Sequence, residues 1–596
     1  MKNVLYSLLL LLGGSTAFAQ SPFRLTALKE AEKQITLLNN ASGLVPVTDL
    51  RDLKIASVQY AFGQKAVFDS IASKYSPVTG YSIAHNPADS ALLILHDQLK
   101  LYNLILITLS DLSTFDAKLL RFIKDQEAIN RVLVVLTGSG KNLALLESLR
   151  SPIIWYPGNT AEGASAAAQL IFGGMAASHR LETAYGNVFK SGSGFSTTKI
   201  RLGYSVPEAV SVSSNRLTGI DSLMKVAIAD HVTPGAVVLL AKDGQVVFHK
   251  AYGNHTYSKE EPTQPDDIFD LASVTKVSAT TPSVMRLVDQ NTIDLKTPIS
   301  TYVARTRTIP DKATVTIREA MLHEAGYTPY IKFYEKLKPL DLNSDSSAAF
   351  PTKVADGFFL RANYFDEVMW PTTLKSKGDT RGKFVYSDVS MYMMKEVIET
   401  ATHQKLNEYV QKEFYRPLGL QTMGFLPRNR FPRSRIVPTT ENDNWFRSMR
   451  VQGYVNDPGA AMAGGVEGHA GLFANANDLA ILWQMYLNKG SYGGQTYFKP
   501  ATVDLFTSEQ SRSGRGYGFA RATNPKQGPK AYPSPLSYGH TGYTGIYVWV
   551  DPKYNLVYVC LTNRVYPDDG KTYGKPTLNI RTLILDRFYE AVVQGN

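Results

Sequence analysis

The sequence holds a single cysteine, Cys560, among its 596 residues. One thiol excludes an internal disulfide framework and any zinc cluster built from several cysteines. No His-x-x-x-His pairing, no Gly-x-Gly-x-x-Gly pattern and no complete Walker A motif is present. Beyond the N-terminus, no stretch approaches the ~18 consecutive apolar residues of a transmembrane helix. We therefore expect no metal site, no nucleotide cofactor and no membrane span. Cys560 sits in a late apolar strand pattern, so we expect it to be a buried packing residue.

The first twenty residues contain an apolar run. Lys2 supplies a positive start, and residues 4–12 form an apolar run that is too short to span a bilayer. Residues 17–19 (Ala-Phe-Ala) fit the small-x-small pattern of signal peptidase. We predict a signal peptide over residues 1–19 and a mature chain that begins at Gln20; the alternative is a buried N-terminal helix. The protein is then exported, to the periplasm or the extracellular space.

The charge balance is positive but not extreme. Lys and Arg outnumber Asp and Glu by 63 to 52, which gives a net charge of +11, and 44% of the residues are hydrophobic. That composition is typical of a packed globular protein. Because an exported protein does not meet the genome, we expect no nucleic-acid partner. The surplus suits anionic cell-wall material, although it is a weak clue.

Short apolar strands alternate with amphipathic helices over residues 20–186. The predicted strands are 55–62, 91–96, 104–109, 131–137 and 152–156, and the predicted helices are 66–74, 115–127 and 143–149. Several of the strands are almost continuously apolar, as buried parallel strands are. The alternation predicts a three-layer α/β domain with a mostly parallel sheet.

Both ends of this domain carry recognisable stretches. Residues 35–40 (Ile-Thr-Leu-Leu-Asn-Asn) and 44–47 (Leu-Val-Pro-Val) lie at its start, and 168–174 (Ala-Gln-Leu-Ile-Phe-Gly-Gly) and 178–181 (Ser-His-Arg-Leu) lie at its end. They resemble the entry and exit of the C-terminal α/β domain of family 3 glycoside hydrolases. The barrel domain that carries the catalytic carboxylate in that family is absent here. The resemblance implies a non-catalytic scaffold or docking domain, with sugar binding left open and a glycosidase disfavoured.

Residues 187–216 are rich in Ser, Gly and Thr and show no lasting period, which predicts a linker with one extended piece. Residues 217–596 form one larger α/β domain.

Ser273 and Lys276 form a Ser-x-x-Lys motif in a helical pattern that reaches Asp289, with a kink expected at Pro282. Residues i and i+3 of a helix lie about 5–6 Å apart at Cβ. Burial lowers the pKa of a lysine, so Lys276 could accept the serine proton. The backbone N–H of Ser273 at the helix start could stabilise an oxyanion. The alternative is an N-cap serine beside a solvated lysine.

Tyr386, Ser387 and Asp388 form a second triplet. A tyrosine near Ser273 and Lys276 could relay a proton to a leaving group; the alternative is a strand or loop tyrosine.

A third motif is His540-Thr541-Gly542-Tyr543, followed by a strand over residues 546–550. Gly542 would let a substrate approach an edge strand closely. The backbone N–H of Tyr543 would be the second oxyanion donor. The alternative is a glycine-rich hairpin.

In this order the three motifs resemble those of the serine β-lactamase and penicillin-binding-protein superfamily. The tyrosine in the second motif resembles the class C-like, DD-peptidase and esterase branch. Supporting resemblances lie at residues 232–238, 242–245, 316–318, 322–327 and 416–423. The resemblance covers nearly all of residues 217–591 and implies an α+β domain, with an antiparallel sheet flanked by helices and an all-helical lobe.

Two residues differ from the usual motifs of this superfamily, and both differences restrict the expected class of substrate. Asp388 stands where the penicillin-recognising branch usually has Asn, and His540 stands where it usually has Lys. A histidine with its ordinary pKa of ~6.5 is mostly neutral at pH 7, and an ionised Asp388 would repel a substrate carboxylate. Both changes argue against an efficient β-lactamase and fit an esterase, aminopeptidase or amidase.

Residues 453–457 and 464–473 resemble the paired motifs of a subgroup that includes cell-wall amidases, with Asn456 in place of the usual His. His469 would line the cleft or bind a backbone carbonyl. Members of that subgroup occur beside family 3 glucosaminidases in peptidoglycan recycling, which by analogy implies a small cell-wall-derived substrate, a muropeptide.

The resemblance implies a serine hydrolase with Ser273, Lys276 and Tyr386 as catalytic residues and no cofactor. Substrate-binding residues would be Asp388, His469, His540, Thr541, Gly542 and Tyr543. Amidase, DD-peptidase, esterase and weak β-lactamase activities stay open. A non-catalytic cell-wall binding or docking protein is the alternative of another class, against which the intact motifs argue. The sequence carries no signal for an oligomeric state.

Overall fold

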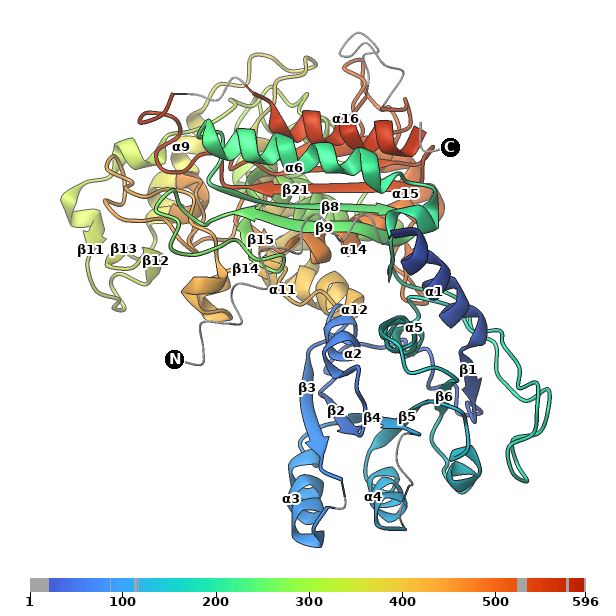
Figure 1. Cartoon of the computed structure of the whole chain (residues 1–596). Coiled ribbons are helices and arrows are strands. Elements are labelled where there is room, and N and C mark those ends of the chain that lie inside the picture. The colour runs from blue at the N-terminus through green and yellow to red at the C-terminus, as the bar shows by residue number, and fades with distance from the viewer. Residues whose placement is uncertain are drawn as a thin grey trace.

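The computed structural model describes residues 21–85, 87–111, 115, 117–522, 533–574 and 578–593, and it forms two lobes (Figure 1). The predicted signal peptide lies outside these residues. We call residues 21–186 the N-terminal lobe and residues 214–593 the C-terminal lobe. Within the described part of the chain, no helix combines the length and the low polarity that crossing a bilayer requires.

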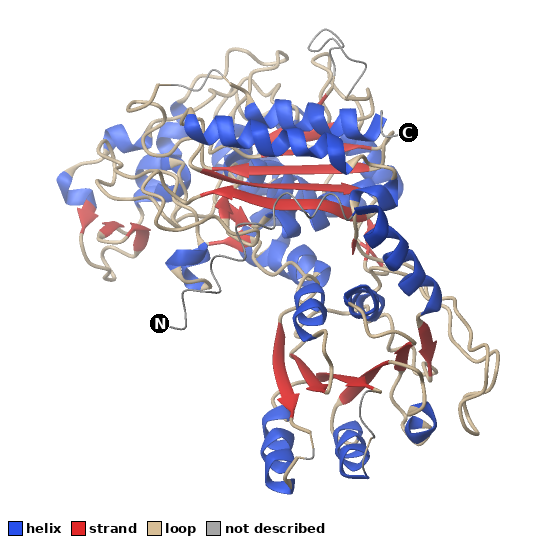
Figure 2. Cartoon of the chain, viewed as in Figure 1, coloured by secondary structure: helices blue, strands red, loops and turns tan. Residues whose placement is uncertain are grey.

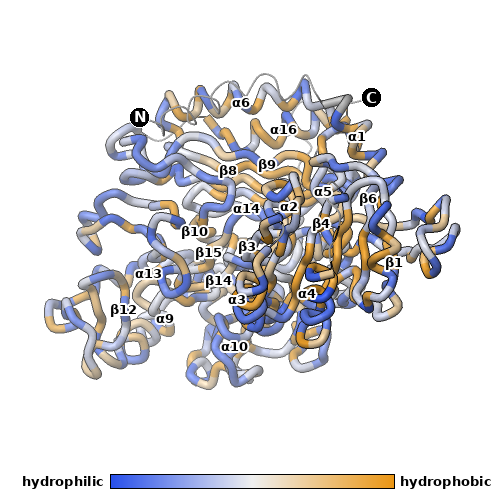
Figure 3. The backbone as a smooth tube through the Cα atoms, turned by 60° about the horizontal axis from the view of Figure 1, so that its bottom comes forward, coloured by the Kyte–Doolittle hydropathy of each residue, from blue (hydrophilic) through white to orange (hydrophobic). Residues whose placement is uncertain are grey.

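The N-terminal lobe is built on a six-stranded sheet in the order β1-β6-β5-β4-β2-β3. The strands are β1 (Thr36–Leu38), β2 (Ile55–Tyr60), β3 (Val78–Ile83), β4 (Leu104–Ser110), β5 (Arg131–Thr137) and β6 (Ile153–Tyr156). Strands β2 to β6 pair in parallel, and β1 pairs antiparallel with β6. Figure 3 shows apolar residues gathered along strands such as β4, all of whose residues are buried.

Helices cover both faces of this sheet, which confirms the three-layer α/β prediction. One core contains residues of α1 (Ser21–Gln34), α2 (Lys65–Ala72) and α5 (Ala161–Phe172). The other contains residues of α3 (Asp89–Leu99), α4 (Ala117–Glu127) and the 3₁₀ turn η1 (Leu143–Leu146). The structure therefore adds α1 and α5 to the predicted elements.

The strand predicted over residues 91–96 is wrong, because this segment lies in α3. Leu95 and Leu99 are buried at helical spacing, whereas Leu93 and Ile94 are 67% and 61% exposed. The missing strand is β3, whose residues are mostly polar or exposed. It pairs only with β2 at the sheet edge, where an apolar run is not needed.

The C-terminal lobe is built on a seven-stranded sheet in the order β18-β19-β20-β21-β8-β9-β7. The strands are β7 (Gly203–Tyr204), β8 (Gly235–Lys242), β9 (Gln245–Gly253), β18 (Ala520–Arg521), β19 (Tyr538–Thr541), β20 (Tyr547–Asp551) and β21 (Leu556–Thr562). All neighbours are antiparallel except β7 and β9. Cys560 in β21 is fully buried, as predicted.

Helices α6 (Ser214–Ala229) and α16 (Ile580–Val593) cover one face of the sheet, and a larger helical region covers the other (Figure 2). This arrangement confirms the expected α+β class. The helical region contains α7 (Thr281–Asp289), α8 (Ile317–Met321), α9 (Trp370–Lys375), α10 (Asp388–Thr402), α11 (Leu406–Val410), α12 (Arg416–Leu418), α13 (Pro458–Met462), α14 (Ala476–Leu487) and α15 (Pro500–Thr507). Short strands accompany it: β10 (Phe269–Asp270), β11 (Leu342–Asn343), β12 (Thr352–Ala355), β13 (Phe358–Leu360), β14 (Gly424–Phe425), β15 (Leu472–Ala474), β16 (Ser491–Tyr492) and β17 (Gln495–Thr496).

The segment predicted as a linker packs against both lobes. Its extended piece is β7, an edge strand of the C-terminal sheet. The buried guanidinium of Arg201 donates to the carbonyl oxygens of Val47 (2.7 Å), Phe172 (2.8 Å) and Thr48 (2.6 Å) in the N-terminal lobe. The next residue, Leu202, is part of the C-terminal core. The segment therefore fastens the lobes together.

Arg201→Ala tests this fastening. Loss of the side chain leaves three carbonyl groups without their charged donor, so we expect the free energy of unfolding to fall by about 3 kcal/mol. Urea denaturation would measure the change, with Arg216→Ala on the exposed face of α6 as the control. Equal stabilities of the two variants would contradict the prediction.

Candidate active site

Ser273 lies in a 3₁₀ turn, η3 (Ala272–Val274), that leads from β10 into a π-helical turn, η4 (Lys276–Thr280), and then into α7. The sequence predicted a helical pattern with a distortion at Pro282. The structure places Pro282 in the first turn of α7, directly after η4, so the irregular stretch precedes the proline. Ser273 itself stays partly exposed.

A buried carboxylate fixes the turn before Ser273. The backbone of Ala272 has φ +45°, which an L-residue rarely adopts. Asp270 accepts the backbone N–H groups of Ala272 (2.8 Å) and Asn456 (2.6 Å). Burial raises the pKa of Asp270 to about 6, and these two hydrogen bonds act against the rise. Asp270 therefore holds the strained turn to a second loop, and no motif in the sequence revealed it.

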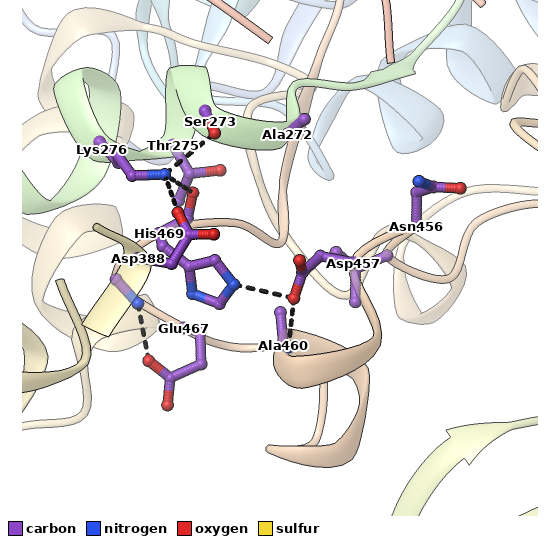
Figure 4. Close-up of polar contacts among 12 residues, drawn as sticks. Ala272, Ser273, Thr275, Lys276, Asp388, Asn456, Asp457, Ala460, Glu467 and His469 are labelled. Atoms are coloured by element: carbon purple, nitrogen blue, oxygen red, sulfur yellow. Dashed lines mark hydrogen bonds and ion pairs between the residues drawn. The ribbon is translucent and has the colours of Figure 1, made fainter. Parts of the chain in front are cut away.

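Lys276 is fully buried, and its ammonium group lies among three acceptors (Figure 4). Its Nζ is 2.9 Å from Ser273 Oγ, 2.7 Å from Asp388 Oδ1 and 3.2 Å from the carbonyl oxygen of His469. Burial lowers the pKa of Lys276, but the charge of Asp388 and the neighbouring Tyr386 outweigh it and raise the pKa. The expectation of a lowered pKa is therefore wrong, because it left out the carboxylate partner.

The second motif forms the start of α10. Ser387 is its N-cap: its Oγ accepts the N–H of Ser390 (3.4 Å) and donates to the carbonyl of Thr328 (2.7 Å). Asp388 is the first residue of the helix, where the helix dipole stabilises a negative charge. The ring centroid of Tyr386 lies 4.9 Å from Lys276 Nζ. Ser273, Tyr386 and Asp388 therefore all lie around the ammonium group of Lys276.

His323 packs against Tyr386, although the sequence analysis did not single it out as a site residue. Its ring centroid lies 4.6 Å from that of Tyr386, and its Nδ1 accepts the N–H of Ser387 at 3.2 Å. Burial lowers its pKa well below the ordinary value, with Arg515 and Lys276 adding to the shift. A neutral imidazole therefore fixes the position of the tyrosine ring.

His540 lies in β19 and faces the same cluster. Its ring centroid is 6.1 Å from that of Tyr386, and its Nδ1 donates to the carbonyl of Thr541 at 2.7 Å. Burial, with the charges of Arg515 and Lys276, lowers its pKa to about 3. The neutral state expected from the sequence is therefore confirmed. Arg515 lies in a loop that carries no motif, so sequence analysis missed it.

Gly542 brings the third motif against the nucleophile turn. A Cβ at this position would lie 2.5 Å from the carbonyl oxygen of Leu271 and 3.0 Å from Cβ of Ile546. Strand β18 pairs with Tyr538 and Gly539, so Thr541 lies beyond that pairing, and its side chain is exposed. Gly542 is therefore needed so that this segment can pack against the turn before Ser273. Sequence analysis assigned the glycine to the approach of a substrate instead.

His469 is buried and binds a carboxylate rather than a backbone carbonyl. Its Nε2 lies 2.8 Å from Asp457 Oδ1, and Asp457 also caps α13 through the N–H of Ala460 (2.8 Å). Burial acts against a charge on His469, but Asp457 and Asp388 outweigh it and raise the pKa. Asp457 ends the motif at residues 453–457, but the sequence analysis did not name it as a site residue because its role depends on this contact.

Among the residues that the structure describes, geometry would allow Asp388, Asp457 and His469 as metal ligands, since their ligand atoms lie within 4.8 Å of one another. The ammonium of Lys276, 2.7 Å from Asp388, already occupies one of these carboxylates and opposes a second cation. The cluster therefore suits an ion-pair network better than a metal.

The close approach at Gly542 predicts a stability defect in Gly542→Ala. The added methyl group meets backbone, which has to move, so we expect the free energy of unfolding to fall by about 1–3 kcal/mol. Thermal unfolding would measure it. Gly63→Ala is the matched control, because its Cβ would meet no atom within 4 Å. If Gly542→Ala and Gly63→Ala both unfold at the temperature of the parent protein, the close packing around Gly542 is contradicted.

The pKa of His540 predicts a pH-dependent stability difference. The unfolded chain binds a proton on this histidine below pH ~6.5, whereas the folded chain does not until about pH 3, so stability falls on acidification through this window. His540→Gln removes that contribution. Between pH 6.5 and 5, we expect the parent protein to lose about 2 kcal/mol more than the variant in urea unfolding. Parallel losses would contradict the assignment.

Comparison with known proteins places this site in a family. The Beta-lactamase family model matches residues 220–578. An N-acetylmuramyl-L-alanine amidase of Bacillus subtilis is 31% identical over 388 residues, which are 60% of this chain and 83% of the relative. A putative D-alanyl-D-alanine carboxypeptidase of Escherichia coli is 29% identical over 424 residues, 65% of this chain and 94% of the relative. A solved penicillin-binding-protein homologue from Caulobacter crescentus has 19% identity and a TM-score of 0.45, and the match covers 65% of this chain and 99% of that one. The chain thus belongs to the Beta-lactamase family of serine hydrolases.

Proposed function

We propose that the protein is an exported serine hydrolase that forms an acyl-enzyme on Ser273 and cleaves amide bonds in peptidoglycan-derived muropeptides. The observation that carries the proposal is the convergence of Ser273 and Tyr386 on Lys276, whose Nζ lies 2.9 Å from Ser273 Oγ and 4.9 Å from the ring centroid of Tyr386. The amide specificity is supported by the relative named as an amidase. Export is supported by the leader-like residues 1–19.

The proposed reaction begins with attack of Ser273 Oγ on an amide carbonyl, while Lys276 and Tyr386 organise removal of the serine proton. The backbone N–H groups of Ser273 and Tyr543 stabilise the tetrahedral oxyanion. Tyr386 then gives a proton to the leaving amine. Water, activated by the same pair, releases the acyl group.

Charge at the site favours an amide without a carboxylate next to His540. With a pKa of about 3, His540 carries no positive charge at neutral pH, and Asp388 adds a negative one. This combination disfavours the carboxylate of a β-lactam at that position. His540, Thr541 and Gly542 would instead line the leaving-group side through neutral contacts.

A carboxypeptidase is the second candidate. Arg515 is a cation close enough to Tyr386 and His540 to influence both, and its Nε is buried without a hydrogen-bond partner among the described residues. Such a guanidinium could bind the terminal carboxylate of a D-Ala peptide. A relative named as a putative D-alanyl-D-alanine carboxypeptidase supports this alternative.

We also propose that residues 20–186 form a non-catalytic docking domain, residues 187–216 a connector and residues 217–596 the hydrolase domain. The limit of the family match at residue 220 supports the last boundary. The resemblance of the first domain to family 3 glycoside hydrolases stays a prediction.

Ser273→Ala tests the nucleophile and the bond together. We expect the parent protein to release intact peptides from muramic acid when incubated with defined muropeptides, and the variant to lose at least a thousandfold in turnover because no acyl-enzyme forms. Mass spectrometry of the products would measure both. Loss of a terminal D-Ala instead would favour the carboxypeptidase. Full turnover by a folded Ser273→Ala protein would refute the mechanism.

A further inference from the structure

The contacts of Lys276 raise a question about where the proton of Ser273 goes. As an ammonium ion, Lys276 has no lone pair and cannot accept a proton until it has given one away. Its geometry is that of a donor, with Nζ at 2.9 Å from Ser273 Oγ and 2.7 Å from Asp388 Oδ1. The two short contacts form a continuous path from the serine to a carboxylate (Figure 4).

The other contacts of the ammonium group offer no comparable acceptor. The carbonyl oxygen of His469, at 3.2 Å, is an amide oxygen that is not protonated at physiological pH. Tyr386 lies with its ring centroid 4.9 Å from Nζ, and its hydroxyl also interacts with the ammonium group, but a phenol is ordinarily neutral at pH 7 and is a weaker acceptor than a carboxylate. Asp388 is therefore the only base among the described partners of Nζ that holds a full negative charge.

We propose that Asp388 is the final acceptor of the serine proton, which reaches it through Lys276; this inference rests on the proposed function. In the step, Ser273 Oγ–H gives its proton to Nζ as Nζ gives one of its own to Asp388 Oδ1. The Oγ lone pair forms the bond to the carbonyl carbon, whose π electrons move to the oxygen. Lys276 keeps its charge, Asp388 loses its charge, and the oxyanion gains one, so the net charge is constant.

The same path returns the proton when the tetrahedral intermediate collapses. The C–N bond breaks, the amine takes a proton from Tyr386, and Tyr386 is reprotonated through Lys276 from Asp388. Asp388 is then again a carboxylate, ready for the attack of water. Tyr386 still gives the proton to the leaving amine, whereas acceptance of the serine proton passes to Asp388, which changes from a substrate-facing charge to a proton acceptor.

The surroundings of Asp388 let it change charge without leaving an uncompensated ion. Lys276 pairs with Asp388, and the pair of His469 and Asp457 lies beside it. Burial, together with nearby negative charges that include Asp388, raises the pKa of two phenols, Tyr330 and Tyr392. When Asp388 takes the proton, the developing oxyanion supplies the negative charge that the buried ammonium of Lys276 needs, so no buried cation is left without a counter-charge.

Asp388→Asn tests the inference, because the amide keeps the shape and the oxygen that accepts Nζ–H but holds no proton acceptor. The readout is the burst of p-nitrophenolate from a p-nitrophenyl ester, which measures acylation of Ser273 alone. We expect a loss of at least tenfold at pH 7, and a rate that rises with pH across the range where the parent rate is level, because Lys276 must then lose its own proton. Glu413→Gln is the matched control, since it neutralises a carboxylate paired with Arg286 of α7 and should acylate like the parent.

The outcomes separate the two claims. A loss below tenfold, or a loss with an unchanged pH profile, overturns the role of Asp388. A parent protein with no Ser273-dependent burst overturns the proposed function as well. If Asp388→Asn does not fold, the parent protein still decides the matter. Its burst rate in mixtures of H₂O and D₂O should curve with deuterium content, because two protons move together, and a linear dependence would overturn the inference.

Discussion

The burial of one positive charge sets the arrangement of the whole catalytic region. An ammonium group removed from water loses several kcal/mol of hydration, and it stays charged only if the protein supplies a partner in good geometry. Lys276 is fully buried, and Asp388 lies 2.7 Å away at the start of α10. The helix start stabilises the carboxylate, so the position of α10 relative to η4 follows from this pair.

The remaining contacts keep that pair in register with Ser273. Asp270 joins the turn at Ala272 to the loop at Asn456, and the buried pair of Arg447 and Asp443 holds that loop in turn through the carbonyls of residues 455 and 456. Gly542 lets the sheet approach the same turn from the other side. Segments that are distant in sequence thus converge on one short 3₁₀ turn, and their contacts reach its backbone rather than the Ser273 hydroxyl, which is left to Lys276.

Sequence analysis predicted contacts between residues that are close along the chain, and it missed contacts between residues that are distant along the chain. Ser273 and Lys276 share a turn, so their spacing predicted their contact. The raised pKa of Lys276 was not predictable in the same way, because Asp388 belongs to another helix. Asp270 and Arg515 belong to none of the motifs, and Asp457 ends the motif at residues 453–457, but the contacts of all three became visible only when the loops were brought together. In the N-terminal lobe, strands that are apolar throughout were predicted, whereas β3 at the sheet edge escaped because its exposed face needs no apolar residues.

The attachment of the N-terminal lobe lies away from the reacting groups. Arg201 ties that lobe to the segment that becomes β7, and β7 is the edge strand opposite the one beside β19. The strand that carries His540 is therefore separated from this attachment by the width of the sheet. Further contacts, such as Gln421 Nε2 to the carbonyl of Ser73 at 2.8 Å, join the lobe to loops of the helical region rather than to the motifs. In the described part of the chain, the hydrogen bonds that fix this lobe therefore end on the connecting segment and on the helical region, and the turn at Ser273 has no share in the attachment.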